Sequence, residues 1–309
     1  MPNGAGAAAS KGQHKSFFPP NLLGGQIELN TPDGKWLRSQ VLGLAFFDSA
    51  SGKSVLISEI KSSRGEVHQP NVVMYPDAFT DGVSASVRYK YTLAGFEQDI
   101  ILQSALPVTP EDYGLNPATT KIQVLTEFLN PPQPVKEKME LRDFDGADLS
   151  DETLHFGRSM TMGRGKAFSL GQTGREIFVQ KQWLKLEGRD FLIEEVSMPD
   201  LKEQLELLPT PEEASLKSES GKLHRTASIK RELPIRKLAK AEKSTMKLAQ
   251  ASMPSTGLVL DYNTLNTTLT NYTFQGDTTY YISGTVVSCR TNTFAAILTV
   301  TRCRSQWSE

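Results

Sequence analysis

The stretch YPDAFTDGVSASVRYKYTLAGFEQDIIL, residues 75–102, carries the clearest strand–turn–strand pattern of the chain. Val87, Tyr89 and Tyr91 alternate with polar residues before Ala94-Gly95, and a second run containing apolar residues follows. Alternation with a period of two predicts strands, and glycine favours a tight turn between them. The stretch therefore predicts an antiparallel hairpin.

A two-residue turn at Ala94-Gly95 sets the expected pairing of the two strands. It places Tyr91 opposite Gln98 and Lys90 opposite Asp99, with the charges on a solvated face. Cross-strand pairs of this kind contribute about 0.2–1 kcal/mol each and help to select the register. We interpret the charges mainly as a folding device, with a binding surface as the alternative. On the apolar face we expect five buried side chains, those of Val87, Tyr89, Tyr91, Ile100 and Leu102.

Short apolar runs separated by turn residues continue on both sides of the hairpin. Residues 26–61 break at Pro32-Asp33-Gly34 and at 49–53, which have turn chemistry and indicate a β-meander. Further β-rich runs follow the hairpin at 120–129, 155–162, 166–171, 176–186 and 190–196. Many short strands favour a sandwich or an open barrel. The sequence therefore predicts a mainly β protein with an antiparallel β-sandwich-like domain.

Composition divides the chain into four segments. We expect a disordered N-terminus over 1–24, the β-sandwich-like domain over 25–209, a basic flexible linker over 210–256 and a short C-terminal β segment over 257–309. A helix predicted over MPDLKEQLELLP, residues 198–209, caps the domain, because proline suits its first turn and leucines recur at helical spacing.

The C-terminal β segment, rich in Thr, Asn and Tyr, has too few residues for a complete solenoid, since solenoids need about three or more stacked units. We therefore expect residues 257–309 to be an incomplete, truncated β unit that is marginally stable alone.

Charge excludes a global attraction to nucleic acid, because 34 basic residues balance 35 acidic ones. Locally, residues 214–256 hold ten Lys and Arg against three Glu, a net charge of +7. This segment is either a solvated spacer or a site for anionic wall polymer, membrane or nucleic acid. It has no interleaved aromatic residues to stack on bases, which argues against specific nucleic-acid binding.

The acidic stretch DFDGADLSDE, residues 143–152, is the best candidate for ligand binding. Asp143, Asp145 and Asp148 offer closely spaced oxygen ligands of the kind that Ca²⁺ accepts. The stretch lacks the full EF-hand pattern, and a solvated acidic loop is the alternative. We predict no other cofactor.

Catalytic signatures are absent from the sequence. The four histidines are scattered singly, and Cys289 and Cys303 match no metal or catalytic motif. Glu194 and Glu195 are a poor pair for hydrolysis, because adjacent strand residues point to opposite faces. No apolar run is long enough for a transmembrane segment, and residues 1–26 lack the apolar core of a signal peptide. We predict no catalytic residue.

The order of residues in the hairpin region resembles a β-rich module of large bacterial wall-associated and Rhs (YD-repeat) proteins. The resemblance lies in YPDAF at 75–79, VRYKY at 87–91 and GFEQDIIL at 95–102, and extends more loosely over about residues 35–200. LTNYTFQGDTTYYISGTV, residues 269–286, resembles the first strands of a β-solenoid in such proteins.

This resemblance implies a non-catalytic structural or interaction module of a larger cell-surface or secreted protein, located outside the cell. Cell-wall polymer or another surface protein is the partner that it implies. A carbohydrate-active hydrolase on a β-sandwich scaffold is the alternative function.

Limited proteolysis should cut the chain first between about residues 210 and 256, where few large apolar residues are available to offset the entropy of ordering. A digestion time course followed by mass spectrometry measures the order of the cuts. Early cleavage within residues 87–102 would contradict the predicted hairpin.

Overall fold

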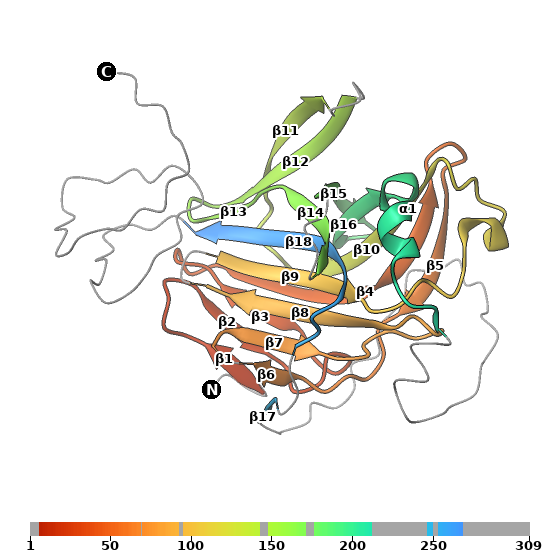
Figure 1. The fold of residues 1–309 in the computed structure, drawn as a ribbon. Coiled ribbons are helices and arrows are strands. Elements are labelled where there is room, and N and C mark those ends of the chain that lie inside the picture. Colours follow the sequence, from red (N-terminus) through yellow and green to blue (C-terminus); the bar gives the residue numbers. More distant parts are fainter. Residues whose placement is uncertain are drawn as a thin grey trace, which may run out of the picture. The chain divides into compact units, whose positions relative to one another are not determined.

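The computed structural model describes residues 6–68, 70–92, 95–142, 148–170, 176–211, 246–249 and 253–267. They belong to one compact unit, Met1–Thr267, which is rich in strands (Figure 1). In chain order the elements are β1 (Ala7–Ala9), β2 (Lys15–Phe18), β3 (Ile27–Asn30), β4 (Trp36–Asp48), β5 (Lys53–Glu59), β6 (Glu66–His68), β7 (Val72–Tyr75), β8 (Ala85–Tyr91), β9 (Gly95–Leu102), a 3-10 turn (Pro110–Tyr113), β10 (Thr120–Phe128), β11 (Val135–Arg142), β12 (Asp148–Phe156), β13 (Met160–Met162), β14 (Gly165–Leu170), β15 (Ile177–Leu186), β16 (Arg189–Ser197), α1 (Met198–Glu206), β17 (Lys247–Leu248) and β18 (Gly257–Thr267).

These strands form two layers that are joined along one side, and all of their pairings are antiparallel except that of β17 with β6. The first layer follows the order β1, β2, β3, β4, β10, β16 and β15, with β5 pairing beside β3 on the long β4. The second runs from β17 through β6, β7, β8 and β9 to β18, and β18 borders β14 and β13 before β12 and β11. β14 also pairs with β15, which links the layers. The predicted mainly β, sandwich-like fold is confirmed.

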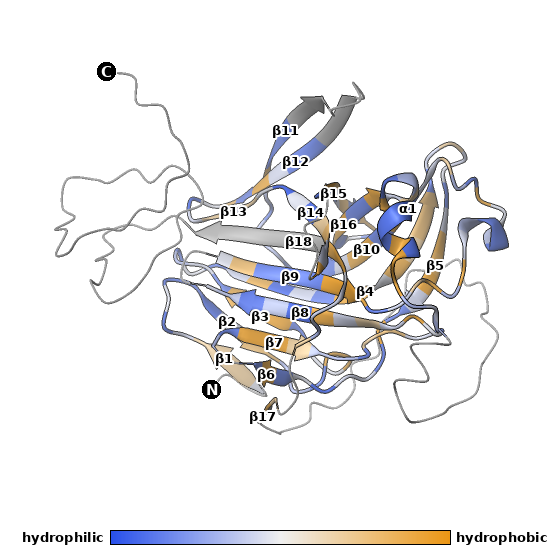
Figure 2. Ribbon diagram, in the orientation of Figure 1, coloured by the Kyte–Doolittle hydropathy of each residue, from blue (hydrophilic) through white to orange (hydrophobic). Residues whose placement is uncertain are grey.

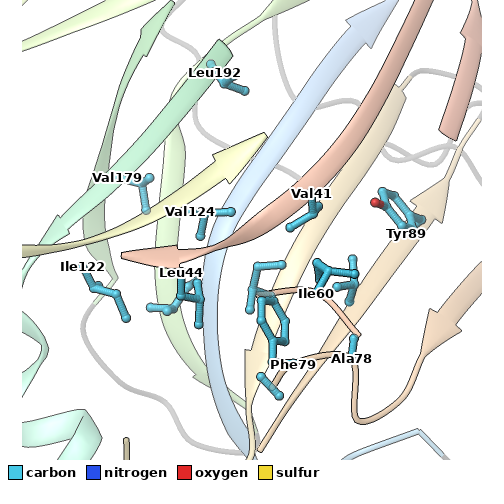
Figure 3. Close-up of a cluster of buried hydrophobic side chains, with 14 of the residues drawn as sticks. Val41, Leu44, Ile60, Ala78, Phe79, Tyr89, Ile122, Val124, Val179 and Leu192 are labelled. Atoms are coloured by element: carbon cyan, nitrogen blue, oxygen red, sulfur yellow. The ribbon is translucent and has the colours of Figure 1, made fainter. Parts of the chain in front are cut away.

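The hydrophobic core lies between the two layers. One large cluster of buried side chains combines Leu44, Val124 and Leu192 from the first layer with Tyr89 and Ile100 from the second. Figure 3 shows side chains of this cluster converging from β4, β10, β16 and β8. Both layers therefore contribute one apolar face to the same core, which is how a sandwich buries its sheets.

The predicted helix is confirmed as α1, which packs on the edge of this core. Pro199 occupies its first turn, as expected from the fixed φ of proline. Leu201 is fully buried, and Leu205 and Leu208 pack against the core cluster.

The predicted hairpin is present as β8 and β9, but its register differs from the expected one. The structure pairs Tyr91 with Phe96, whereas Gln98 is expected opposite Tyr91. The amide of Thr92 donates to the carbonyl of Gly95 at 2.8 Å, so Thr92 pairs with Gly95 and the connection lies one residue earlier in the chain than expected. The expected register was wrong because it placed the turn one residue too late in the chain, at Ala94-Gly95.

A shift of two residues leaves every side chain on the face that was expected, because side chains alternate with a period of two. The five side chains predicted to be buried are each at most 9% exposed: Val87, Tyr89, Tyr91, Ile100 and Leu102. The opposite face of β9 is buried as well, although the sequence analysis expected it to be solvated. The charges of this hairpin therefore lie in a largely covered environment.

Residues 6–24 depart from the expectation of a disordered N-terminus over 1–24. They contain β1 and β2, and β2 pairs with β3. Phe18 explains the difference, since it is buried and its ring stacks on that of Phe96 with centroids 6.1 Å apart. The segment thus buries apolar surface that its Gly- and Ala-rich composition does not indicate.

The strand β18 departs from the expectation of a separate C-terminal unit over 257–309. It pairs along β9, with Leu258 opposite Leu102, and Leu258 and Leu260 are buried in the core between the layers. An apolar run beside an open sheet edge gains burial and hydrogen bonds by pairing there. Residues 268–309, with the stretch expected to start a solenoid, lie outside the described residues.

The segment expected to be a linker, 210–256, has both of its ends on the same compact unit. α1 packs on the core just before it, and near its end the amide of Met246 donates to the carbonyl of Gly6 at 3.0 Å. β17 then pairs in parallel with β6. The described residues on both sides of 212–245 therefore pack on the same unit. Residues 212–245 themselves lie outside the described part.

Removing β18 should unfold the unit. A chain that ends at residue 252 leaves one edge of β9 unpaired and loses the burial of Leu258, Val259 and Leu260, about 1.5–3 kcal/mol for each side chain. We expect no cooperative thermal transition by circular dichroism for this chain. A chain that ends at residue 267 keeps β18 and should melt cooperatively. Equal melting of the two chains would contradict the assignment.

Candidate functional site

Charged side chains are buried at several places in the described part of the chain, and two of these places, each with a cation paired to a buried carboxylate, are its candidate sites. The first place is the β8–β9 hairpin, where hydrophilic residues occupy the middle of β9 between hydrophobic ends (Figure 2). The second is the edge of β15, which the side chains of β12 cover. Both sites consist of cations and carboxylates in contact.

In the hairpin, opposite charges face each other across β8 and β9. Arg88 donates from Nε to Oδ2 of Asp99 at 2.8 Å, and Nζ of Lys90 lies 3.4 Å from Oε2 of Glu97. Each pair is directly opposite in the observed register. The pairing of opposite charges across the hairpin is as expected, with partners moved by the register shift. These contacts support the interpretation of the charges as a folding device.

Burial changes the acidity of Asp99. Removal from water raises the pKa of its carboxyl to about 6, the neighbouring Glu97 adds to the increase, and the Arg88 guanidinium opposes it. Its Oδ1 accepts no hydrogen bond in the described structure. The group can therefore exchange a proton near neutral pH, although Arg88 holds the other oxygen in place.

At the second site, carboxylates of β12 bind the open edge of β15. The amide of Lys181 donates to Oδ1 of Asp151 at 3.0 Å, and the amide of Trp183 donates to Oε2 of Glu152 at 3.2 Å. Lys136 of β11 donates to the carbonyl of Trp183. Backbone groups at a sheet edge need partners when they are covered. The β11–β12 hairpin supplies these partners from side chains instead of from another strand.

Asp151 also contacts a lysine side chain that is shielded from water. Nζ of Lys181 lies 2.8 Å from Oδ2 of Asp151, and the two side chains are 2% and 1% exposed. Glu194 of β16 stands directly opposite Lys181 in the register and is also buried. The ring of Trp183 on the same face of β15 packs against Phe156, with centroids 5.5 Å apart. One amine and two carboxyl groups are thus enclosed beside an aromatic cluster.

The predicted Ca²⁺ ligands fall largely outside the described structure. Asp143 and Asp145 lie outside the described residues, and Asp148 is described only by its backbone, as the first residue of β12. Among the residues that are described, no group of three or more His, Cys, Asp or Glu side chains is arranged to hold a metal ion. The Ca²⁺ site stays a prediction.

Asp151 and Glu152, from the same acidic stretch, belong to β12 and have amine partners, Lys181 and Lys136. A solvated acidic loop therefore does not describe them. The sequence holds one signal of this site: in a predicted strand, Lys181 lies between Val179 and Trp183 on the face that those apolar residues share. A lysine on the apolar face of a strand requires a buried partner, but the pattern does not identify the partner.

Glu194 and Glu195 point to opposite faces of β16, as predicted. Glu195 accepts from Nζ of Lys121 at 2.6 Å and from Nε2 of Gln123 at 2.8 Å, on the face away from the core. Glu194 lies on the core side with Leu192. The two carboxylates therefore do not share a cleft.

Comparison with protein-family models, with curated proteins and with solved structures finds no match to this chain. None of the described helices is long and apolar enough to cross a membrane.

Asp99→Asn should change how stability depends on pH. The folded carboxyl has a pKa of about 6 against an ordinary value of 3.8, so the folded state binds more protons between these values. Asp99 therefore lowers the free energy of unfolding as the pH rises through this range, by on the order of 3 kcal/mol in total. We expect urea unfolding at about pH 4 and about pH 7 to show this loss in the wild-type chain and not in the variant.

The matched control is Asp77→Asn, because Asp77 also pairs with a cation, Lys61, but has an exposed side chain. This variant should keep the pH dependence of the wild-type chain. Identical pH dependence in wild type and Asp99→Asn would rule out the buried carboxyl as its source.

Proposed function

We propose that this chain is a non-catalytic structural and interaction module of a larger bacterial cell-surface or secreted protein. The proposal rests on one observation: the residues that resemble such modules make contacts that hold the strands of the fold together. A carbohydrate-active hydrolase would instead require carboxylates that face one another across a cleft, about 5–9.5 Å apart.

The YPDAF residues, 75–79, make contacts with parts of the chain that are distant in sequence. The buried hydroxyl of Tyr75 donates to the carbonyl of Pro19 at 2.7 Å. Asp77, with a positive φ of 43°, accepts from Nζ of Lys61 at 2.8 Å. One short stretch therefore ties the N-terminal strands and the end of β5 to β7. Residues that hold strands in place in this way support a scaffold role.

The charged residues of the described strands support the same role. Arg189 makes two hydrogen bonds to Glu127, at 2.7 and 2.9 Å, across the β10–β16 pair. Asp112 accepts from the amide of Thr109 at 2.7 Å and caps the 3-10 turn. Together with the pairs on β8–β9 and β15, these contacts give the carboxylates partners within the fold.

The partner that we propose is cell-wall polymer or another surface protein. The basic composition of residues 214–256 favours binding to an anionic polymer, because the segment contains ten basic residues and only three acidic ones. Electrostatic binding of this kind weakens as added salt screens the charges.

Retention on purified cell walls that carry teichoic acid tests this function. We expect the wild-type chain to be retained at low salt and released at high salt, without release of reducing sugar ends from the wall. The triple variant Arg236→Gln, Lys237→Gln and Lys240→Gln should elute at a lower salt concentration than the wild type.

The control neutralises three exposed lysines elsewhere, Lys15→Gln, Lys53→Gln and Lys202→Gln, and should elute with the wild type. Elution of the wild type, both variants and a neutral protein together would contradict binding through the basic segment. Catalytic release of sugar by the wild-type chain would favour the hydrolase.

A further inference from the structure

The amine of Lys181 and the carboxyl group of Asp151 are in contact, and Glu194 stands opposite Lys181 in the register of β15 and β16. The Nζ–Oδ2 distance is 2.8 Å, and the side chains of Lys181 and Asp151 are 2% and 1% exposed. The Lys121–Glu195 pair, at 2.6 Å, has side chains that are 24% and 19% exposed. Of the lysine–carboxylate pairs in the described residues, the Lys181–Asp151 pair is therefore the most strongly shielded from water.

We propose that Lys181 and Asp151 condense into an isopeptide bond, which cross-links β15 to β12. In water, hydration stabilises ammonium and carboxylate ions and opposes their condensation. Burial removes this hydration, so the uncharged amide product is favoured over the ion pair. The fold also holds the two groups in contact, so the step is intramolecular.

Hydrogen bonding distinguishes the two oxygens of Asp151. Oδ1 accepts from the backbone amide of Lys181 at 3.0 Å, and this donor stabilises the negative charge that develops on Oδ1 during attack. Oδ2 is the oxygen next to Nζ, at 2.8 Å. Oδ1 therefore becomes the amide oxygen, and Oδ2 leaves.

The step balances within the cluster. The Nζ–Cγ bond forms and the Cγ–Oδ2 bond breaks. Of the three protons on the lysine ammonium, one remains on the amide nitrogen and two move to Oδ2, which leaves as water. One of these two passes through the carboxylate of Glu194, which stands across from Lys181 and ends in its starting state. No oxidant, metal or further reactant is required.

The bond would close the seam at which the β11–β12 hairpin meets the edge of β15. Its two residues are 30 positions apart in the chain. A covalent link here would survive reducing conditions. It would fix β12 where the amide oxygen of Asp151 and the carboxylate of Glu152 accept from the edge amides of β15. The inference rests on this geometry and does not depend on the proposed function.

The intact mass of the purified full chain tests the proposal. We expect it to lie below the mass of the sequence by one water. Trypsin does not cut after an acylated lysine, so digestion should yield peptide 143–158 joined to peptide 176–185, with Lys181 uncut inside the second peptide. Fragmentation of the joined species should locate the bond between Asp151 and Lys181. A wild-type chain of full sequence mass, or a water loss confined to peptide 143–158, would overturn the proposal.

Three variants separate the roles of the residues. Lys181→Arg and Asp151→Ala each remove one reacting group and should have the full sequence mass. Glu194→Gln keeps both reacting groups and should be recovered with the bond largely unformed. Rapid bond formation in Glu194→Gln would overturn the role of Glu194.

The matched control is Lys136→Arg, since Lys136 pairs with Glu152 on the same seam in a more exposed position. It should lose one water like the wild type. If Lys181→Arg or Asp151→Ala does not fold, the wild-type mass and the joined peptide still decide the question.

Discussion

β9 is paired along both edges and buried on both faces, and the rest of the fold depends on meeting these requirements. β8 occupies one edge and β18 the other. The polar residues of such a strand need partners inside the protein, since water does not reach them. Gln98 donates to Thr126 of the opposite layer at 3.3 Å, and Asp99 accepts from Arg88. The strand thus fixes the position of both layers by polar contacts as well as by packing.

The backbone groups at the edges of the layers obtain their hydrogen-bond partners in different ways. β14 divides its pairing, using Gly165–Ala167 for β15 and Phe168–Leu170 for β18, and so belongs to both layers. Beyond the reach of β14, the amides of β15 bind carboxylates of β12. An uncovered edge would be a template for pairing with other chains. Side chains therefore complete the hydrogen bonding where no strand is available.

Local patterns in the sequence predicted the local structure well. Alternation identified the strands of the hairpin, and the predicted break at Pro32-Asp33-Gly34 lies between β3 and β4, with a positive φ at Gly34. The pattern around Pro199 located α1. The register of β8 and β9 was missed because a glycine near a turn does not fix which residues of the chain form that turn.

Pairing between distant segments could not be predicted in the same way. The run Leu258 to Leu260 is recognisable as a strand, but its composition does not state which sheet accepts it. Phe18 was overlooked because the residues that precede it, 4–12, are rich in Gly and Ala and show no strand alternation. At the candidate site, Lys181 was visible as an anomaly in an apolar pattern, while its partners came from strands that precede and follow it. Only the folded arrangement brings these groups together.

The place of β18 also determines the order of events during synthesis on the ribosome. Leu102 pairs with Leu258, so about 150 residues are translated between β9 and its second neighbour, which takes roughly 8–30 s at typical rates. During this interval the nascent chain presents a strand with one free edge, and neighbouring nascent chains on the same message present an identical one. Premature association between polysome neighbours competes with correct closure, and a slower or more crowded polysome shifts that competition toward aggregation.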